Sequence, residues 1–236
     1  MFGLTLLKTC ATVAVIAAAT WAGAGSASTI TSTSVLLTTS DVGTSWTVDY
    51  TCTYDPACAG ASAQANFTLT TVATTATQVK WGFNVVFSNT STSSAGGFLT
   101  STGFNTGPNA TMSGFTNYSG GGDLATNWHG GAGSVPGMST ELCIWDGSNC
   151  SASNTHTMTP GNTDKVSFTL TTGLQTSLTM DNFAVKEAGV GPCDGTSYEF
   201  GGKVRVPAPV PLPAGGLMLV GGLGALGAAR RRRKAA

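Results

Sequence analysis

The 236-residue chain has no formal net charge at pH 7, with 11 basic and 11 acidic side chains, but these charges are unevenly distributed. Residues 28–206 hold all 11 acidic residues and only five basic ones, so this region has a formal charge of −6. A nucleic-acid partner requires a basic surface, and we therefore expect none. Abundant threonine, serine and glycine disfavour long helices and favour strands joined by turns.

The first 27 residues have the features of a secretory signal peptide. Lys8 supplies a positive charge, residues 11–19 are apolar, and Gly25, Ser26 and Ala27 form a small-residue cleavage site. We therefore expect export, with cleavage after Ala27. Cleavage after residues 22–24 and an uncleaved anchor are the alternatives.

Residues 28–206 are predicted to form one exported domain built of strands. The clearest strand is 77–89, where apolar side chains recur at every second position, namely Val79, Trp81, Phe83, Val85 and Phe87. Alternation also predicts strands at 44–51, 66–72, 140–145, 165–172, 177–186 and 198–206. In 177–186 the apolar positions change parity, which indicates a β-bulge near Asp181 and Asn182. We expect an all-β fold, an antiparallel β-sandwich resembling a jelly roll.

Residues 91–137 are glycine-rich and show little periodicity. This pattern leaves two alternatives open. The region holds short irregular strands, or it is a long loop over one edge of the sandwich.

Cysteine spacing predicts two local disulfides. Cys52 and Cys58 flank one turn-forming segment, and Cys143 and Cys150 flank another, although spacing alone does not fix connectivity. Cys193 is left over. Such cysteines suit an oxidising compartment. A metal site is the alternative, but it is poorly supported because the chain has no Cys-x-x-Cys pair and only two histidines, so we expect no metal.

The C-terminus contains three consecutive segments of different character. Residues 207–214 are a proline-rich spacer that ends in the motif Val210, Pro211, Leu212, Pro213 and Ala214. Residues 215–229 are apolar and would span only about 22 Å as a helix, so a transmembrane segment here needs help from its flanks. Residues 230–236 form a basic tail containing Arg230, Arg231, Arg232, Arg233 and Lys234, which should remain cytoplasmic.

This order of motif, apolar segment and basic cluster resembles the VPLPA variant of the PEP-CTERM sorting signals. The resemblance covers about the last tenth of the chain. It implies processing by an exosortase or archaeosortase-like membrane enzyme, first at the inner membrane. It further implies delivery to the cell surface or extracellular matrix of a Gram-negative bacterium, in association with extracellular polysaccharide. An ordinary tail anchor is the alternative.

Signals for catalysis are weak. The sequence contains no nucleophile elbow, zinc-protease helix, phosphate loop or dinucleotide fingerprint, so we expect no catalytic residue and no cofactor. His129 and His156 are isolated in loops. Trp128 and Trp145 lie beside loops and are candidates for stacking on a sugar. We therefore expect a structural or adhesive protein. A carbohydrate-binding module is the competing class, and a surface hydrolase is a third class that would need His129 beside an acid in a pocket.

Overall fold

The computed structural model describes residues 28–92, 97–118, 128–151, 158–189 and 197–206. The predicted signal peptide, proline-rich spacer, apolar segment and basic tail lie outside these ranges, as do Cys193 and His156. Within the described ranges the chain forms strands and one 3₁₀ helix, and no helix there is long and apolar enough to cross a membrane.

Twelve strands, each paired only in antiparallel fashion, make up the described fold. They are β1 (Thr29–Ile30), β2 (Ser34–Thr38), β3 (Ser45–Thr51), β4 (Ser62–Thr74), β5 (Gln78–Asn89), β6 (Phe98–Gly107), β7 (Thr111–Tyr118), β8 (Trp128–Ala132), β9 (Leu142–Asp146), β10 (Thr163–Gly173), β11 (Ser177–Ala188) and β12 (Ser197–Arg205). The 3₁₀ helix η1 (Pro56–Cys58) lies between β3 and β4.

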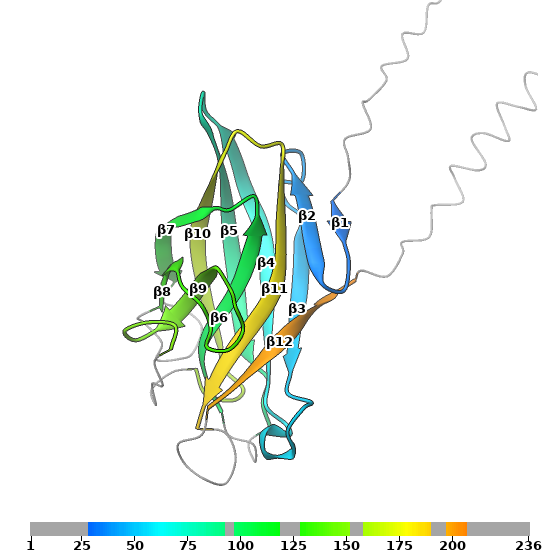
Figure 1. Ribbon diagram of the computed structural model, residues 1–236, viewed down its shortest axis with the longest axis vertical. Helices are drawn as coiled ribbons and strands as arrows, with labels where there is room; N and C mark the ends of the chain where they lie inside the picture. The colour runs from blue at the N-terminus through cyan, green and yellow to red at the C-terminus, as the bar shows by residue number, and fades with distance from the viewer. Residues whose placement is uncertain (1–27, 93–96, 119–127, 152–157, 190–196, 207–236) are drawn as a thin grey trace, which may run out of the picture.

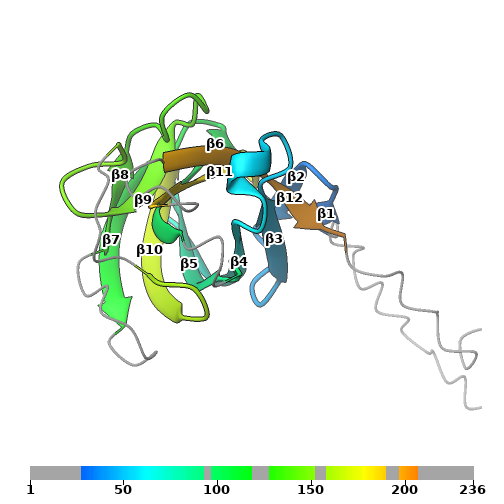
Figure 2. The ribbon, with the colours of Figure 1, turned by 90° about the horizontal axis from the view of Figure 1, so that it is seen from below.

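The strands form two facing layers that belong to one continuous sheet, in the order β7-β10-β5-β4-β3-β12-β11-β6-β9-β8 (Figure 2). Strands β1 and β2 are attached beside β11 (Figure 1). This arrangement confirms the all-β, antiparallel, sandwich-like prediction. It differs from two independent sheets because β12 belongs to both layers.

β12 passes from one layer to the other at a pair of glycines. Its residues up to Gly201 pair with β11, and its residues from Gly202 onward pair with β3. A Cβ atom on Gly202 would lie 2.5 Å from Val48 Cγ1 and from Tyr50 Cε1, closer than real contacts allow. The strand can therefore bend across the core at this point only because no side chain is present.

The two ends of the sheet, β7 and β8, come together through side chains. The side-chain nitrogen of Asn117 on β7 donates to the backbone carbonyl of Trp128 on β8 at 3.0 Å. A Cβ atom on Gly130 of β8 would lie 2.6 Å from the Phe115 ring of β7, so the strands approach closely where that side chain is missing. The sheet is therefore nearly closed.

The core lies between the layers and includes the predicted inward face of β5. All five predicted residues, Val79, Trp81, Phe83, Val85 and Phe87, are buried. Their aromatic rings contact rings from other strands, as where Phe83 packs against Phe168 with centroids 5.5 Å apart. The period-two prediction is confirmed.

Most of the described part of the glycine-rich region forms β6, β7 and β8, so the long-loop alternative is wrong for that part. β6 lies inside the sheet between β11 and β9. The Thr100 and Thr102 hydroxyls are buried and donate to β11 carbonyls, each at 3.0 Å. Buried polar groups are tolerated when they are hydrogen-bonded, and these bonds explain how a threonine-rich strand occupies the interior.

The predicted β-bulge is confirmed in β11. The register with β6 shifts between Asp181 and Ala184, and Asn182 has a positive φ of 48°. The side-chain nitrogen of Asn182 donates to the Met138 carbonyl at 3.0 Å, and this hydrogen bond stabilises the bulge. At the bulge β11 changes partners, from β2 at residues 177–181 to β12 at residues 184–188.

Candidate functional site

Both predicted disulfides are present. Cys52 and Cys58 form one, with Cα atoms 5.9 Å apart, and Cys143 and Cys150 form the other, with Cα atoms 6.2 Å apart. Each closes a short local loop, as the turn-forming residues between the cysteines predicted.

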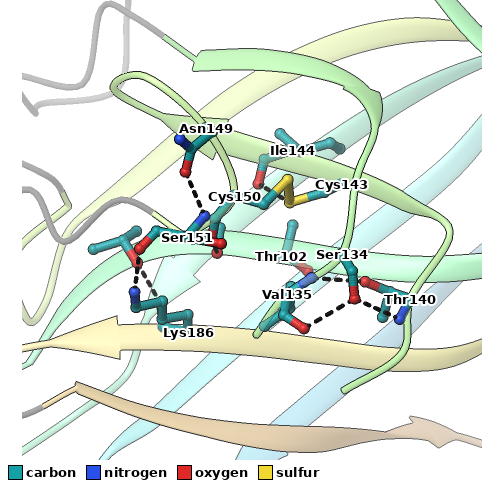
Figure 3. Close-up of a disulfide and its surroundings, with 12 residues drawn as sticks. Thr102, Ser134, Val135, Thr140, Cys143, Ile144, Asn149, Cys150, Ser151 and Lys186 are labelled. Atoms are coloured by element: carbon teal, nitrogen blue, oxygen red, sulfur yellow. Dashed lines mark hydrogen bonds between the residues drawn. A yellow bond between two sulfur atoms is a disulfide. The ribbon is translucent and has the colours of Figure 1, made fainter. Parts of the chain in front are cut away.

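The Cys143–Cys150 disulfide fixes a segment over the outer side of β6 and β11 (Figure 3). The Ser101 hydroxyl of β6 donates to the Cys150 carbonyl at 3.0 Å. The buried Lys186 ammonium of β11 donates to the Ser151 carbonyl at 2.6 Å. The disulfide therefore holds the Cys150 and Ser151 carbonyl groups where they accept hydrogen bonds from Ser101 of β6 and Lys186 of β11.

Trp128 is not a surface platform, which corrects the prediction from its place beside a loop. Only 1% of the residue is exposed, and its ring stacks on Phe87 with centroids 5.5 Å apart. Its indole nitrogen donates to Asp164 Oδ2 at 2.7 Å. The glycine-rich sequence before it suggested a loop, but Trp128 is the first residue of β8 and faces the core.

Trp145 remains the stacking candidate on the described surface. It is half-buried on β9 and lies opposite His129 of β8, with ring centroids 6.2 Å apart. A Cβ atom on Gly131 would lie 3.6 Å from Trp145 Cη2, so this edge of the indole packs over Gly131. The indole nitrogen points inward, where it is buried and has no hydrogen-bond partner in the described part of the chain. The half-buried indole and the exposed His129 imidazole beside it can contact a ligand.

His129 of β8 has an acid nearby, Asp146 of β9. Burial raises the pKa of the Asp146 carboxyl, and its hydrogen bond with the Gly147 backbone and the positive charge of His129 act against this rise. The interaction between His129 and Asp146 in the described structure is one of charge, not a hydrogen bond, and no described group of His, Cys, Asp and Glu could hold a metal. The described pair therefore lacks the hydrogen bond with which an acid orients a histidine base in a Ser-His-Asp triad.

Two clefts on the outer surface of β12 were not anticipated from the sequence. The Tyr54 cleft has a volume of about 490 Å³ and is lined by Asp49, Thr51, Thr53, Tyr54, Phe200, Gly201 and Lys203. The Asn182 cleft has a volume of about 510 Å³ and is lined by Thr33, Ser34, Asp181, Asn182, Phe183, Gly201 and Gly202. Gly201 belongs to both, so the clefts meet where β12 crosses between the layers.

Tyr54 is held in a fixed position although 62% of it is exposed. It lies in the loop closed by the Cys52–Cys58 disulfide, next to Asp55, whose carboxylate accepts from the Ala57 amide at 2.8 Å. The Tyr54 hydroxyl donates to the Glu199 carbonyl of β12 at 3.0 Å. Partial burial, followed by the Glu199 and Asp55 charges, raises the pKa of Tyr54, so the hydroxyl remains a donor at neutral pH.

Charged groups of both signs line the Tyr54 cleft. Asp49 accepts two hydrogen bonds from Arg205, one of them an ion pair of 2.8 Å, and one from Gln64 at 2.7 Å. Lys203 is exposed opposite Asp49 on β12, and its ammonium has no partner among the described residues.

Comparisons with protein-family models, with curated proteins and with solved structures gave no match to this chain.

Proposed function

We propose that this chain is an exported surface or matrix protein that an exosortase-like transpeptidase sorts, with a structural or adhesive role in association with extracellular polysaccharide. The observation that carries the proposal is the order of the last 27 residues, in which the Val210 to Ala214 motif is followed by an apolar segment and a basic cluster. In this role the chain is a substrate of the sorting enzyme and needs no catalytic residue of its own.

Two structural features support the proposal. The disulfides fit an oxidising compartment outside the cytoplasm. The two ends of the described domain also lie close together, because the Val204 amide near the end of β12 donates to the Ser32 carbonyl just after β1 at 3.0 Å (Figure 1). The two flanking segments would therefore join the domain at neighbouring points.

Each segment has a separate physical role in the proposed route. The signal peptide starts export, and the apolar segment with its basic cluster holds the precursor in the inner membrane. Proline fixes φ and disfavours helix in the preceding residue, so the spacer keeps the motif extended and accessible to a membrane enzyme. Cleavage within or just after the motif then releases the apolar segment and the basic cluster.

Substitution of the motif prolines tests this route in the native host. Pro211→Ala together with Pro213→Ala should leave an unprocessed precursor with a normally folded domain, because both residues lie beyond β12. Neutral replacements of Arg230 to Lys234 should instead impair retention or orientation in the membrane. Normal processing of the proline variant would contradict recognition of the motif, and an intact thermal transition is the control for folding.

A carbohydrate-binding module is the second candidate function. The observation that favours it is the half-buried Trp145 ring beside the exposed His129 imidazole. The Trp128 part of that prediction is withdrawn, since this ring is buried.

A further inference from the structure

The Tyr54 and Asn182 clefts adjoin at Gly201, which lines both, and the pair of clefts is called the β12 groove. Each cleft has a volume in the range of small-molecule sites, about 300–1,000 Å³. The groove follows the outside of β12 where that strand crosses between the layers, and a side chain at position 201 would divide it. A ligand long enough to lie over Gly201 would contact both clefts.

Tyr54 gives this groove an exposed aromatic wall whose position is set before any ligand binds. The disulfide loop and the hydroxyl contact to the Glu199 carbonyl both restrict the ring. A group that is already ordered loses little conformational freedom on binding, so its contacts contribute more to affinity. Flat apolar faces with a polar edge suit sugar rings, which present C–H groups on one face and hydroxyls around the rim.

The polar groups of the groove include both donors and acceptors. In the Tyr54 cleft, the Lys203 ammonium is a donor, and the Thr51 and Thr53 hydroxyls can act either way. In the Asn182 cleft, Asp181 is an acceptor, and the side-chain nitrogen of Asn182 is already bonded to the Met138 carbonyl, which leaves the side-chain oxygen of Asn182 as an acceptor. Such mixed groups match the hydroxyls of a sugar chain.

The charge balance argues against an anionic ligand. The groove contains Asp49 and Asp181 along with Lys203, and Asp49 is already paired with Arg205. Residues 28–206 have a formal charge of −6, which repels a long polyanion. We propose that this groove binds a neutral oligosaccharide chain, with Tyr54 stacking on one sugar and Gly201 allowing the chain to pass into the second cleft. The inference rests on the proposed association with polysaccharide and names the site and ligand class for it, but it does not depend on processing of the C-terminus.

Binding is tested on the full-length chain, purified in a detergent without a sugar head group so that the detergent does not compete. Isothermal titration calorimetry measures the affinity for each probe. The neutral probes are maltohexaose, cellohexaose and laminarihexaose, and the anionic probe is alginate. We expect at least one neutral hexasaccharide to bind, with an affinity that changes little when sodium chloride is raised, because an uncharged ligand is not screened.

Two variants address the groove. Tyr54→Ala removes the exposed ring, and Gly201→Leu blocks the junction of the clefts. A Cβ atom at Gly201 would meet Met138 Cε at 3.8 Å, an ordinary contact, so the backbone accepts a side chain there. Each variant should weaken binding roughly tenfold or more, the loss of about one good contact. Tyr54→Phe should keep part of the affinity. Leu174→Ala is the matched control, since Leu174 is 56% exposed in the β10–β11 connection. This variant should bind the oligosaccharide as the unaltered chain does.

Three outcomes would overturn the inference. These are no binding of any neutral hexasaccharide, binding of alginate alone that disappears in high salt, or binding that survives both groove variants and is lost in Trp145→Ala. The last outcome would place the ligand on the Trp145 ring instead. Because the experiment uses unprocessed chain, its failure leaves the sorting route untouched, and a failure of sorting leaves the binding result intact.

Discussion

Glu187 is a fully buried carboxyl group held by a single hydroxyl group. Ser91 Oγ lies 3.0 Å from Glu187 Oε2 and also 3.0 Å from the Ser62 carbonyl oxygen. A serine hydroxyl has one proton, so both contacts are satisfied when a protonated Glu187 donates to Ser91 and Ser91 donates to Ser62. Burial raises the pKa of Glu187 to about 7, and the Ser91 hydrogen bond lowers it only in part.

This raised pKa predicts that the domain loses stability as the pH rises. The folded state holds a proton that the unfolded chain releases near its ordinary pKa of 4.5. The free energy of unfolding should therefore fall between about pH 4.5 and 7, by up to about 3 kcal/mol in total. Urea denaturation across this range measures the effect.

Glu187→Gln is the matched variant for that experiment, because it keeps the shape and removes the titration. Its free energy of unfolding should fall less with pH than that of the unaltered chain. The difference between the two chains isolates Glu187 from Asp146, whose carboxyl pKa is also raised. Equal slopes in the two chains would mean that Glu187 does not titrate as its burial indicates.

Phe83 is a second residue with a measurable contribution. It is 1% exposed and packs edge-on to Trp46 and against Phe168. Phe83→Ala should lower the free energy of unfolding by about 3–5 kcal/mol, because it removes a buried ring and leaves a cavity. Leu174→Ala on the surface should change it by less than about 0.5 kcal/mol. A small effect at Phe83 would contradict its place in the core.

At the scale of strands, the sequence predicted β5 well and β6 poorly. In β5 the inward positions are all large and apolar, so alternation is visible. In β6 the buried positions include Thr100, Ser101 and Thr102, whose hydroxyls find carbonyl acceptors only after β11 and the Cys150 segment are in place. Local pattern cannot show bonds between residues that lie about 50 to 90 positions apart in the sequence.

The candidate sites also divide into those that local sequence predicts and those that depend on contacts between distant residues. Both disulfides could be predicted because each is a local pair. The Tyr54 cleft could not, because it joins β3 with β12 at the point where β12 changes layers. The glycine pair Gly201 and Gly202 was the sequence signal for that crossover, but glycine is common throughout this chain. Trp128 was misplaced because a tryptophan that begins a strand after a glycine-rich segment resembles a loop residue.

The Cys143–Cys150 disulfide predicts a stability change at the level of a whole segment. Replacing both cysteines by serine should lower the free energy of unfolding by about 2 kcal/mol, as expected for a short closed loop. The amides of β9 should also exchange faster with solvent, because the segment over β6 and Lys186 is less restrained. The Cys52/Cys58 double serine variant is the comparison, and it should leave β9 protection unchanged. Unaltered β9 exchange in the first variant would contradict this role of the disulfide.

At the scale of the whole molecule, a compact all-β domain lies between two sequence segments with export and sorting features. The buried core and the two disulfides would suit the proposed location outside the cytoplasm. The groove across β12 offers a surface for a glycan. The segments that would carry the domain to its destination lie in residues 1–27 and 207–236. The sorting proposal requires removal of the signal peptide, the apolar segment and the basic cluster.

Intact-mass spectrometry of the protein isolated from its native host tests that requirement most directly. The sorting proposal predicts a mature chain that begins at Ser28 and ends within or just after Val210 to Ala214, with any added mass at the new C-terminus identifying what it is attached to. A mature chain that still carries Arg230 to Lys234 in full would contradict the proposal and make the C-terminus a plain tail anchor.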